Sequence, residues 1–578
     1  VFWRLQGAFP ELAEVMSPLS VSLLLLAAAA AKKDPTDGAT KIPKEKRVTF
    51  GMIIDAGSQG SRIHIYEWDQ RHFKQLPPRL SIPITAETWS ARLKPGIGAY
   101  DDPEAAALSL QPLIEFAKIS LKNYESKWDG FPIYVKATAG MRERPDGPRL
   151  ATMNAIREYL RDSCPFAFFA SENARVISGE EEAAYAWVGV NYVDGALEDA
   201  VDLGRSFGTA DPARARGTLE MGGSSSQIAF YRPQQDILSN LFKLQIGATA
   251  HVNIYAHSFL HYGHVSARQG MWSQLGAMAG CWSGGRNSTP ECTIVDACLP
   301  QWASISDGQI TSVTGVVGLA PPFAYDPVST NITIVGSFDS TSHKKKAASM
   351  EACLAQTRLL FKPQFSEWCR WSHRGQCSFV GVYQPPLPTH TDVSFGQFVV
   401  LGGYYKLFQQ LGLETATMET VIKLATDQCA EHLVDSSDII DADEFCFLAA
   451  FAYSMAIDGH HFAPSRNFTA VDAALYRNQE GRAVKVGWPL GAMIYEINAL
   501  PWVYDPDVDD DDDDAGGAND RDPRDEMPYS NLFVVDAAHR APLAGRPRLF
   551  ALVGATALLA AVGAHRACRR QPAPHGAY

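Results

Sequence analysis

The chain has 578 residues, of which 46% are hydrophobic, and its formal net charge is −13. This length allows two or more domains with sizeable cores, and the ordinary hydrophobic fraction excludes wholesale disorder. Between 505 and 526 twelve acidic residues stand against two arginines, a net of −10, so the remainder carries only about −3. This balance indicates no nucleic-acid partner.

An apolar run from Leu19 to Ala31 stands near the beginning of the sequence and ends in small residues. Its length and its A-x-A-like end are typical of a signal peptide, and a signal anchor is the alternative for segment 1–31. The polar stretch 32–46, which contains Pro and Gly, is predicted to be a linker.

From 47 to 192, strand-like runs alternate with helical patterns such as 105–127, which predicts a first α/β domain. The run "MIIDAGSQGSRIHIYEW" (52–68) indicates a hairpin with Asp55 at the end of its first strand and a tip rich in Gly and Ser. Gly and Asp suit tight turns. Bare backbone N–H groups and hydroxyls also cradle phosphate, however, and a carboxylate can hold a metal ion.

A second hairpin, "GTLEMGGSSSQIAFYRP" (217–233), lies in a second α/β domain predicted over 193–483. It repeats the layout of the first hairpin, with Glu220 in the place of Asp55 and Ser226 in the place of Ser61. Turn chemistry alone does not explain two such hairpins in register. Facing each other across a cleft, they would hold a polyphosphate from both sides and direct two carboxylates at one Ca²⁺ or Mg²⁺ ion.

The cysteines indicate the compartment of the protein. Of the ten, eight fall between 281 and 446, which predicts disulfide-bearing insertions in the second domain and an oxidising, secretory environment. Zinc binding is the alternative, but no paired C-x-x-C spacing is present. Three N-glycosylation sequons suit the same environment, at Asn287, Asn331 and Asn467.

The last part of the chain is predicted to return to the first domain and then to reach a membrane. Segment 486–502 contains apolar residues at helical spacing, and segment 484–504 would complete the first domain, while 505–548 is predicted to be an acidic stalk. The uncharged run 549–564 is predicted to be a transmembrane helix, although it is shorter than the usual ~20 residues. Arginines in 565–578 predict a cytoplasmic tail.

Taken together, the two hairpins resemble the phosphate loops of the superfamily that contains actin, sugar kinases and ATP-driven chaperones. Four blocks resemble, in order, the conserved regions of the nucleoside triphosphate diphosphohydrolases, the ecto-apyrase family: "DAGSQGSRIHIY" (55–66), "KATAGMR" (136–142), "ISGEEEAAYAWVGVNY" (177–192) and "LEMGGSSSQIAF" (219–230). The resemblance spans about 47 to 502. It implies an α/β fold of two actin-like (RNase H-like) domains with a cleft between them, to which the terminal membrane segments are added.

The resemblance also assigns the catalytic groups. It implies that Glu182 is the base that activates a water in line with the terminal phosphorus. Glu180 and Glu181 would then form only the acidic start of a helix. The groups around the attacking water match three further residues, Thr138, Ser225 and Gln227.

The metal and phosphate positions follow in the same way. The resemblance implies that Asp55 and Glu220 hold Ca²⁺ or Mg²⁺ through its hydration shell. The matching phosphate-binding positions are Gly57, Ser58, Gly60, Arg62, Arg142, Gly222, Gly223 and Ser224. For the two arginines, a structural ion pair is the alternative. The aromatic ring that stacks on the base falls roughly on Tyr405, with a place in the core as the alternative for Tyr404 and Tyr405.

Several positions depart from the family pattern. Glu220 stands where Asp is usual, and Gln59 stands where Ser or Thr is usual. Ala183 and Ala186 stand where the family has glycines beside the base. These changes bear on metal preference and on the room available around Glu182.

The sequence therefore predicts a membrane-anchored nucleoside tri- or diphosphate phosphohydrolase whose catalytic part lies in the Golgi lumen or outside the cell. Its predicted partner is the nucleotide substrate, and no nucleic acid is expected. Two alternatives remain: a lumenal nucleotide-binding module that does not hydrolyse, and an exopolyphosphatase-like hydrolase with the same superfamily hairpins.

Overall fold

The computed structural model describes the following residues: 48–73, 78, 80–86, 88–194, 196, 215–232, 236–247, 250–281, 292–301, 304–305, 332–361, 369, 371, 375–388, 397–429, 440, 442–471, 486–505 and 534–536. The predicted leader, linker, transmembrane helix and cytoplasmic tail lie outside the described residues. Among the residues that are described, no helix has both the length and the apolar composition needed to cross a bilayer.

The first predicted hairpin forms the centre of a six-stranded sheet. Strand β1 (Val48–Ala56) runs antiparallel to β2 (Ser61–Asp69) and parallel to β5 (Ile133–Ala137). The strand order is β18-β4-β2-β1-β5-β6, completed by β4 (Ser90–Lys94), β6 (Ala174–Val176) and β18 (Val534–Asp536). We call this sheet and the helices on its outer face lobe I.

The outer face of the lobe I sheet is covered by helices. Alternate residues of β1, such as Met52 and Ile54, enter a core that α4 (Gln111–Ser120) and α6 (Asp146–Ser163) close from outside. The helical pattern predicted at 105–127 is divided into α3 (Pro103–Leu108), α4 and η4 (Lys122–Gly130). The division fits the sequence, because Pro112 has no backbone N–H and is favoured in the first turn of a helix.

The second hairpin forms the centre of a seven-stranded sheet, which we call lobe II together with its outer helices. The order is β15-β16-β14-β7-β8-β10-β9. The strands are β7 (Gly217–Met221), β8 (Ser225–Tyr231), β9 (Leu241–Ile246), β10 (Ala250–Leu260), β14 (Phe398–Gly402), β15 (Thr415–Thr417) and β16 (Asn467–Ala470). The helices are α10 (His264–Met278), α11 (His343–Arg358), α13 (Gly403–Gln410), α14 (Met418–Gln428) and α15 (Ala442–Ser454).

Two smaller sheets complete the described strands. A three-stranded sheet contains β11 (Cys292–Pro300), β13 (Ile332–Phe338) and β12 (Ser304–Ile305). A two-stranded sheet pairs β3 (His72–Phe73) with β17 (Val503–Tyr504).

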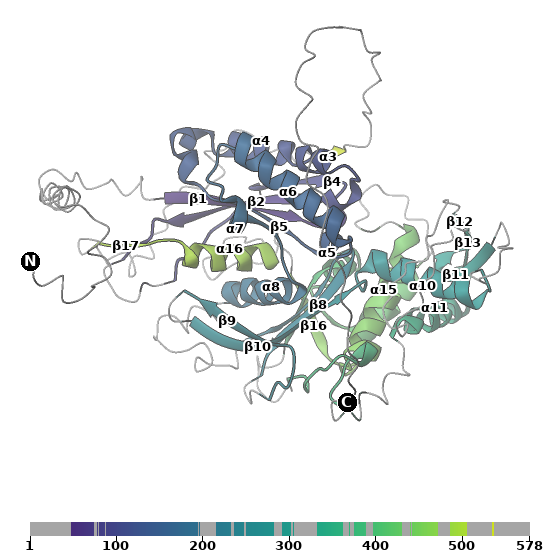
Figure 1. Ribbon diagram of the computed structural model, residues 1–578. Helices are drawn as coiled ribbons and strands as arrows, with labels where there is room; N and C mark the ends of the chain where they lie inside the picture. The colour runs from purple at the N-terminus through teal and green to yellow at the C-terminus, as the bar shows by residue number, and fades with distance from the viewer. Residues whose placement is uncertain are drawn as a thin grey trace, which may run out of the picture. The chain divides into compact units, whose positions relative to one another are not determined.

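Helices α8 (Gly179–Val193) and α16 (Trp488–Ala499) lie between the two large sheets (Figure 1). They share one core with Ile53 of β1 and Val399 of β14, so each sheet buries one face against this middle layer. The two helices approach closely, because a Cβ placed on Gly491 would lie 1.8 Å from the Tyr185 carbonyl oxygen. The helix predicted from the pattern at 486–502 is therefore present, and it packs at the centre of the molecule.

The described disulfides all belong to the lobe II half of the chain: Cys298–Cys353, Cys369–Cys377 and Cys429–Cys446. Cys281 is also disulfide-bonded, and Cys164 of lobe I is free. The predicted concentration of disulfides between 281 and 446 is confirmed for the described cysteines.

Candidate active site

The tips of the two hairpins lie at one cavity between the lobes. In the first tip Gly57 N donates to Gly60 O over 3.0 Å, and in the second Gly222 N donates to Ser225 O over 2.9 Å. Asp55 pairs in register with Arg62, as Glu220 does with Gln227. Residues of both tips line the cavity, so the predicted duplication places two equivalent loops around one space.

The two tips are almost in contact with each other. A Cβ on Gly223 would stand 2.6 Å from Ser58 Oγ and 2.9 Å from Gln59 Cγ. Gln59, which departs from the family pattern, therefore packs against the opposite loop at a position where only a glycine leaves room.

Three carboxylates line this cavity, and of these Glu182 is buried while Asp55 and Glu220 are partly buried. Burial raises the pKa of Asp55 to about 7, with Arg62 opposing the rise and Glu182 adding to it. Burial also raises the pKa of Glu182, against the pull of Arg142. The pKa of Glu220 is raised well above its ordinary value by burial and by the charges of Glu182 and Asp55.

This arrangement fits a divalent cation. Glu220 Oε2 is buried and has no hydrogen-bond partner among the described residues, and the neighbouring acids repel its charge. A cation would relieve that repulsion. No three His, Cys, Asp or Glu side chains in the described part of the chain are grouped closely enough to bind a metal directly. The ligation through water that the sequence resemblance implies stays a prediction.

Glu182 is positioned by the start of α8. Ser178 Oγ caps the helix by accepting from Glu181 N, and the Glu181 carboxylate accepts in turn from Ser178 N. Glu181 also forms a two-point ion pair with Arg175. Its role is thus the structural one that the sequence predicts, and the next residue, Glu182, turns into the cavity with 7% of its surface exposed.

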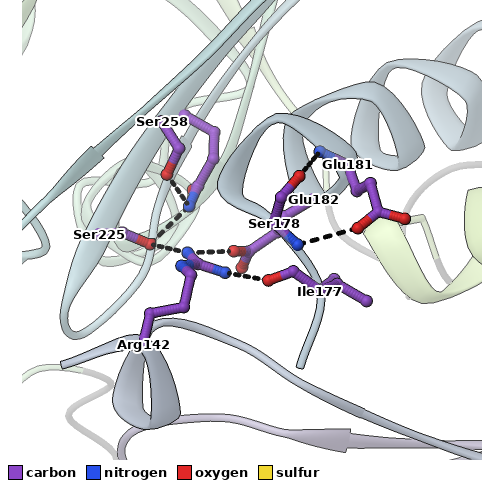
Figure 2. A network of polar contacts seen from close by, with 8 residues as sticks. Arg142, Ile177, Ser178, Glu181, Glu182, Ser225 and Ser258 are labelled. Atoms are coloured by element: carbon purple, nitrogen blue, oxygen red, sulfur yellow. Dashed lines mark hydrogen bonds and ion pairs between the residues drawn. The ribbon is translucent and has the colours of Figure 1, made fainter. Parts of the chain in front are cut away.

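A polar chain connects Glu182 to the second hairpin (Figure 2). Arg142 Nη2 donates to Glu182 Oε2 over 2.8 Å and to Ser225 Oγ over 3.2 Å. Gln227 Nε2 donates to the same Ser225 hydroxyl over 2.5 Å. The structure thus brings Glu182, Ser225 and Gln227 together, and Arg142 forms an ion pair with Glu182, one of the two alternatives left open by the sequence.

Most of the other predicted positions also line the cavity: Gly57, Ser58, Gly60, Arg62, Thr138, Gly222, Gly223 and Ser224. Tyr405 differs from them. It is buried on α13, and it does not belong to the described residues that line this space. Its base-stacking role stays a prediction without support from the geometry.

Sequence reasoning missed several lining residues, among them Arg92, His264, Lys406 and Trp488. Arg92 of β4 pairs in register with Arg62 of β2. Burial together with Arg62 lowers the pKa of Arg92, and burial together with Arg92 lowers that of Lys406. No local motif marks these cations, because they meet only when β4 and α13 come together. They give the cavity a positive side suited to a polyanion.

Two sheet-based lobes meet at this cavity, where a duplicated Gly/Ser hairpin and acids beside clustered cations define a site suited to binding a polyphosphate. Residues 41–511 match the GDA1/CD39 (nucleoside phosphatase) family, and the chain belongs to this family. The protein is accordingly a nucleoside phosphatase, a hydrolase.

Known relatives agree with this class. Ectonucleoside triphosphate diphosphohydrolase 7 of Mus musculus is 28% identical, over 79% of this chain and 74% of its own. Probable apyrase 6 of Arabidopsis thaliana is 26% identical, over 77% of this chain and 72% of its own. A solved nucleoside triphosphate hydrolase from Neospora caninum has a TM-score of 0.51 at 16% identity, over 83% of this chain and 97% of its own, which shows the shared fold.

Proposed function

We propose that the protein is a membrane-anchored apyrase-like enzyme that removes the terminal phosphate from nucleoside tri- and diphosphates. The observation that carries the proposal is Glu182, a buried carboxylate that faces both phosphate loops and is hydrogen-bonded to Arg142. A nucleotide-binding module without hydrolysis would not require a carboxylate there next to Ser225 and Gln227.

The substrate is bound by the two hairpin tips. The backbone N–H groups of the glycines and the Ser58 hydroxyl would cradle the phosphates. Arg62, with Arg92 beside it, would balance their charge. Asp55 and Glu220 would hold Ca²⁺ or Mg²⁺ through water. When bound, such an ion supplies charge neutralisation at the phosphate oxygens.

Glu182 acts as the general base. Its raised pKa suits a group that must accept a proton near neutral pH. Ser225, held by Gln227 and Arg142, orients the water together with Thr138. The water oxygen bonds to the terminal phosphorus, its proton passes to Glu182, and the bond to the bridging oxygen breaks. Inorganic phosphate and the shortened nucleotide leave, and no phospho-enzyme is needed.

The catalytic part is proposed to lie in the secretory lumen or outside the cell. The disulfides of lobe II suit that environment. The name of the mouse relative, an ectonucleoside triphosphate diphosphohydrolase, is consistent with it. Asn467 is exposed at the start of β16, so its sequon is accessible to glycosylation.

The test is Glu182→Gln, with Glu180→Gln as the matched control on the same helix turn. Phosphate release from ATP or ADP should fall at least about 100-fold in the first variant, because the base is lost. Nucleotide binding should remain, and the control should retain full activity. Turnover that survives in Glu182→Gln would refute the assignment, and faster turnover of polyphosphate than of nucleotide in the parent protein would favour the exopolyphosphatase alternative.

A further inference from the structure

Glu143 lies at the end of α5 (Ala139–Arg142) in lobe I, but its carboxylate contacts lobe II. Oε2 accepts from Ser224 Oγ over 2.8 Å, and Oε1 accepts from Ser266 Oγ over 3.0 Å. Nδ1 of His261 lies 3.1 Å from Oε1. One side chain of lobe I thus binds three separate positions of lobe II.

The three partners belong to a single assembly around the second phosphate loop. The first-turn amides of α10 donate to this loop: His264 N to Gly222 O, and both Val265 N and Ser266 N to Gly223 O, over 3.0–3.1 Å. Gly263 permits the approach, because a Cβ there would lie 2.3 Å from Ser224 N. Any group that binds His261 and Ser266 therefore also fixes the loop that carries Ser224.

The backbone of His261 supports this interpretation. Its φ angle is +70°, in the left-handed region that a residue with a side chain adopts at a cost. The conformation places the imidazole beside Glu143, where both side chains are one-quarter exposed. The fold therefore accepts the backbone cost at His261, and in return the imidazole lies beside a carboxylate of the other lobe.

Helix α5 and the residue after it contact both halves of the site. A Cβ on Gly140 would stand 2.6 Å from the Ser58 Cα, so the helix packs against the first phosphate loop. Arg142 binds Glu182, and Glu143 binds Ser224 of the second loop. Gly140, Arg142 and Glu143 therefore relate the base and the two loops to one another.

We infer that Glu143 is a positioning residue, a lobe-to-lobe latch that holds the second phosphate loop in this position before the nucleotide arrives. The inference rests on the proposed function, since it requires the loop to bind phosphate. A latch of this kind raises the fraction of molecules ready to bind substrate. Once the nucleotide itself connects the two loops, the latch contributes little more.

The kinetic consequence is a separation of KM from kcat. Loss of Glu143 should raise the KM for nucleotide about tenfold, equivalent to about 1.4 kcal/mol, and kcat should change by less than about threefold. A purely structural role would instead lower the melting temperature and the active fraction and leave KM unchanged.

The experiment compares Glu143→Ala with Glu115→Ala, a half-exposed glutamate of lobe I that pairs with Lys118 within its own helix. Steady-state phosphate release and the melting temperature are measured for both variants on the full chain. A tenfold rise in KM in the first variant alone supports the latch. An unchanged KM, or a loss of kcat at constant KM, overturns it. Failure of the proposed function is a different result, because the parent protein would then release no phosphate from nucleotides.

A double-mutant cycle identifies the partner. His261→Asn tolerates the left-handed backbone, since Asn adopts this region readily, but it removes the imidazole. If Glu143 acts through His261, the KM increases of Glu143→Ala and His261→Asn should be clearly less than multiplicative in the double variant. Fully multiplicative effects would show that the two side chains act independently, and would refute the His261 part of the latch.

Discussion

The two lobes present equivalent hairpins to the cavity but support them differently. In lobe I the tip rests on its own lobe: a Cβ on Gly60 would lie 2.4 Å from the Leu93 carbonyl oxygen. In lobe II the tip is fixed by the first turn of α10 and by Glu143 from the other lobe. The duplicated sequence pattern therefore reproduces the geometry of each loop. The residues that hold each loop in place differ, because they come from the neighbouring elements and not from the pattern.

The electrostatic surroundings of the two acids differ as well. Asp55 lies near Arg62 and Arg92, which favour its charged form. The charged groups acting on Glu220 are the acids Glu182 and Asp55, which oppose it. The acid of the first hairpin is thus partly neutralised by its own lobe, whereas the acid of the second hairpin faces like charges.

Removing each acid in turn should expose this difference and has the largest expected effect. Both Asp55→Asn and Glu220→Gln should lose at least about 100-fold in metal-dependent phosphate release, because the hydrated cation loses an anchor. With EDTA present, Glu220→Gln should melt about 2–4 °C higher than the parent, since a repelled buried charge is gone. Asp55→Asn should gain less stability than Glu220→Gln, because Arg62 and Arg92 already offset part of the cost of the buried Asp55 charge.

Asp101→Asn, at an exposed site in lobe I, serves as the control and should match the parent in both measurements. Equal melting shifts in the two hairpin variants would show that the lobes do not differ in this respect. Full activity of either variant in the presence of EDTA would show that phosphate release does not need a cation at this site.

Glycine-to-alanine changes separate support within a lobe from contact across the cleft. Gly223→Ala would drive a Cβ into Ser58 and Gln59 of the opposite loop, so we expect KM for nucleotide to rise about tenfold while the melting temperature stays within ~2 °C. Gly60→Ala would meet the backbone of β4 in its own lobe and should lower the melting temperature by several degrees.

Gly130→Ala, outside the cavity in lobe I, is the control, because a Cβ there would meet no atom within 4 Å. It should behave nearly as the parent in both measurements. If Gly223→Ala lowered the melting temperature as much as Gly60→Ala, the contact with the opposite loop would not explain why position 223 requires glycine.

The sequence predicts the parts of the site that lie within single motifs. The hairpins, their acids, the helix start at Glu181 and the helix at 486–502 follow from local patterns, because glycine-rich tips, capping residues and apolar periodicity act over a few neighbouring residues.

The sequence does not predict contacts between residues that are distant along the chain. Arg92 reaches the cavity because β4 pairs with β2, and Lys406 because α13 follows β14, whose neighbour is β7. Glu143 belongs to no recognisable motif, and its contact with His261 depends on how the two lobes pack against each other. The helix break within 105–127 was missed because the apolar pattern continues past Pro112, although the proline is the physical cause of the break.

The smallest expected effect concerns acid stability, where lobe II should be the weaker half. His460 is 1% exposed, and burial, followed by the charges of His461 and His257, lowers its pKa to about 3. In the unfolded chain this group titrates near 6.5, so between about pH 6.5 and 3 the unfolded state binds the extra proton. Above pH 6.5 His460 is neutral in both states and does not lower the free energy of unfolding. As the pH falls below 6.5, only the unfolded chain binds the proton, so the free energy of unfolding decreases. At pH 5.5 the loss should be about 1.4 kcal/mol.

Denaturant unfolding of the parent and of His460→Gln at pH 7.5 and 5.5 measures this contribution. Only the change between the two pH values is compared, so any loss of stability that the variant shows at neutral pH cancels. The parent should lose about 1.4 kcal/mol more than His460→Gln over that interval. His343→Gln, at a side chain that is 91% exposed in the same lobe, should follow the parent. Equal losses in the parent and in His460→Gln would mean that the imidazole is protonated in the folded state, and that the acid sensitivity of lobe II has another origin.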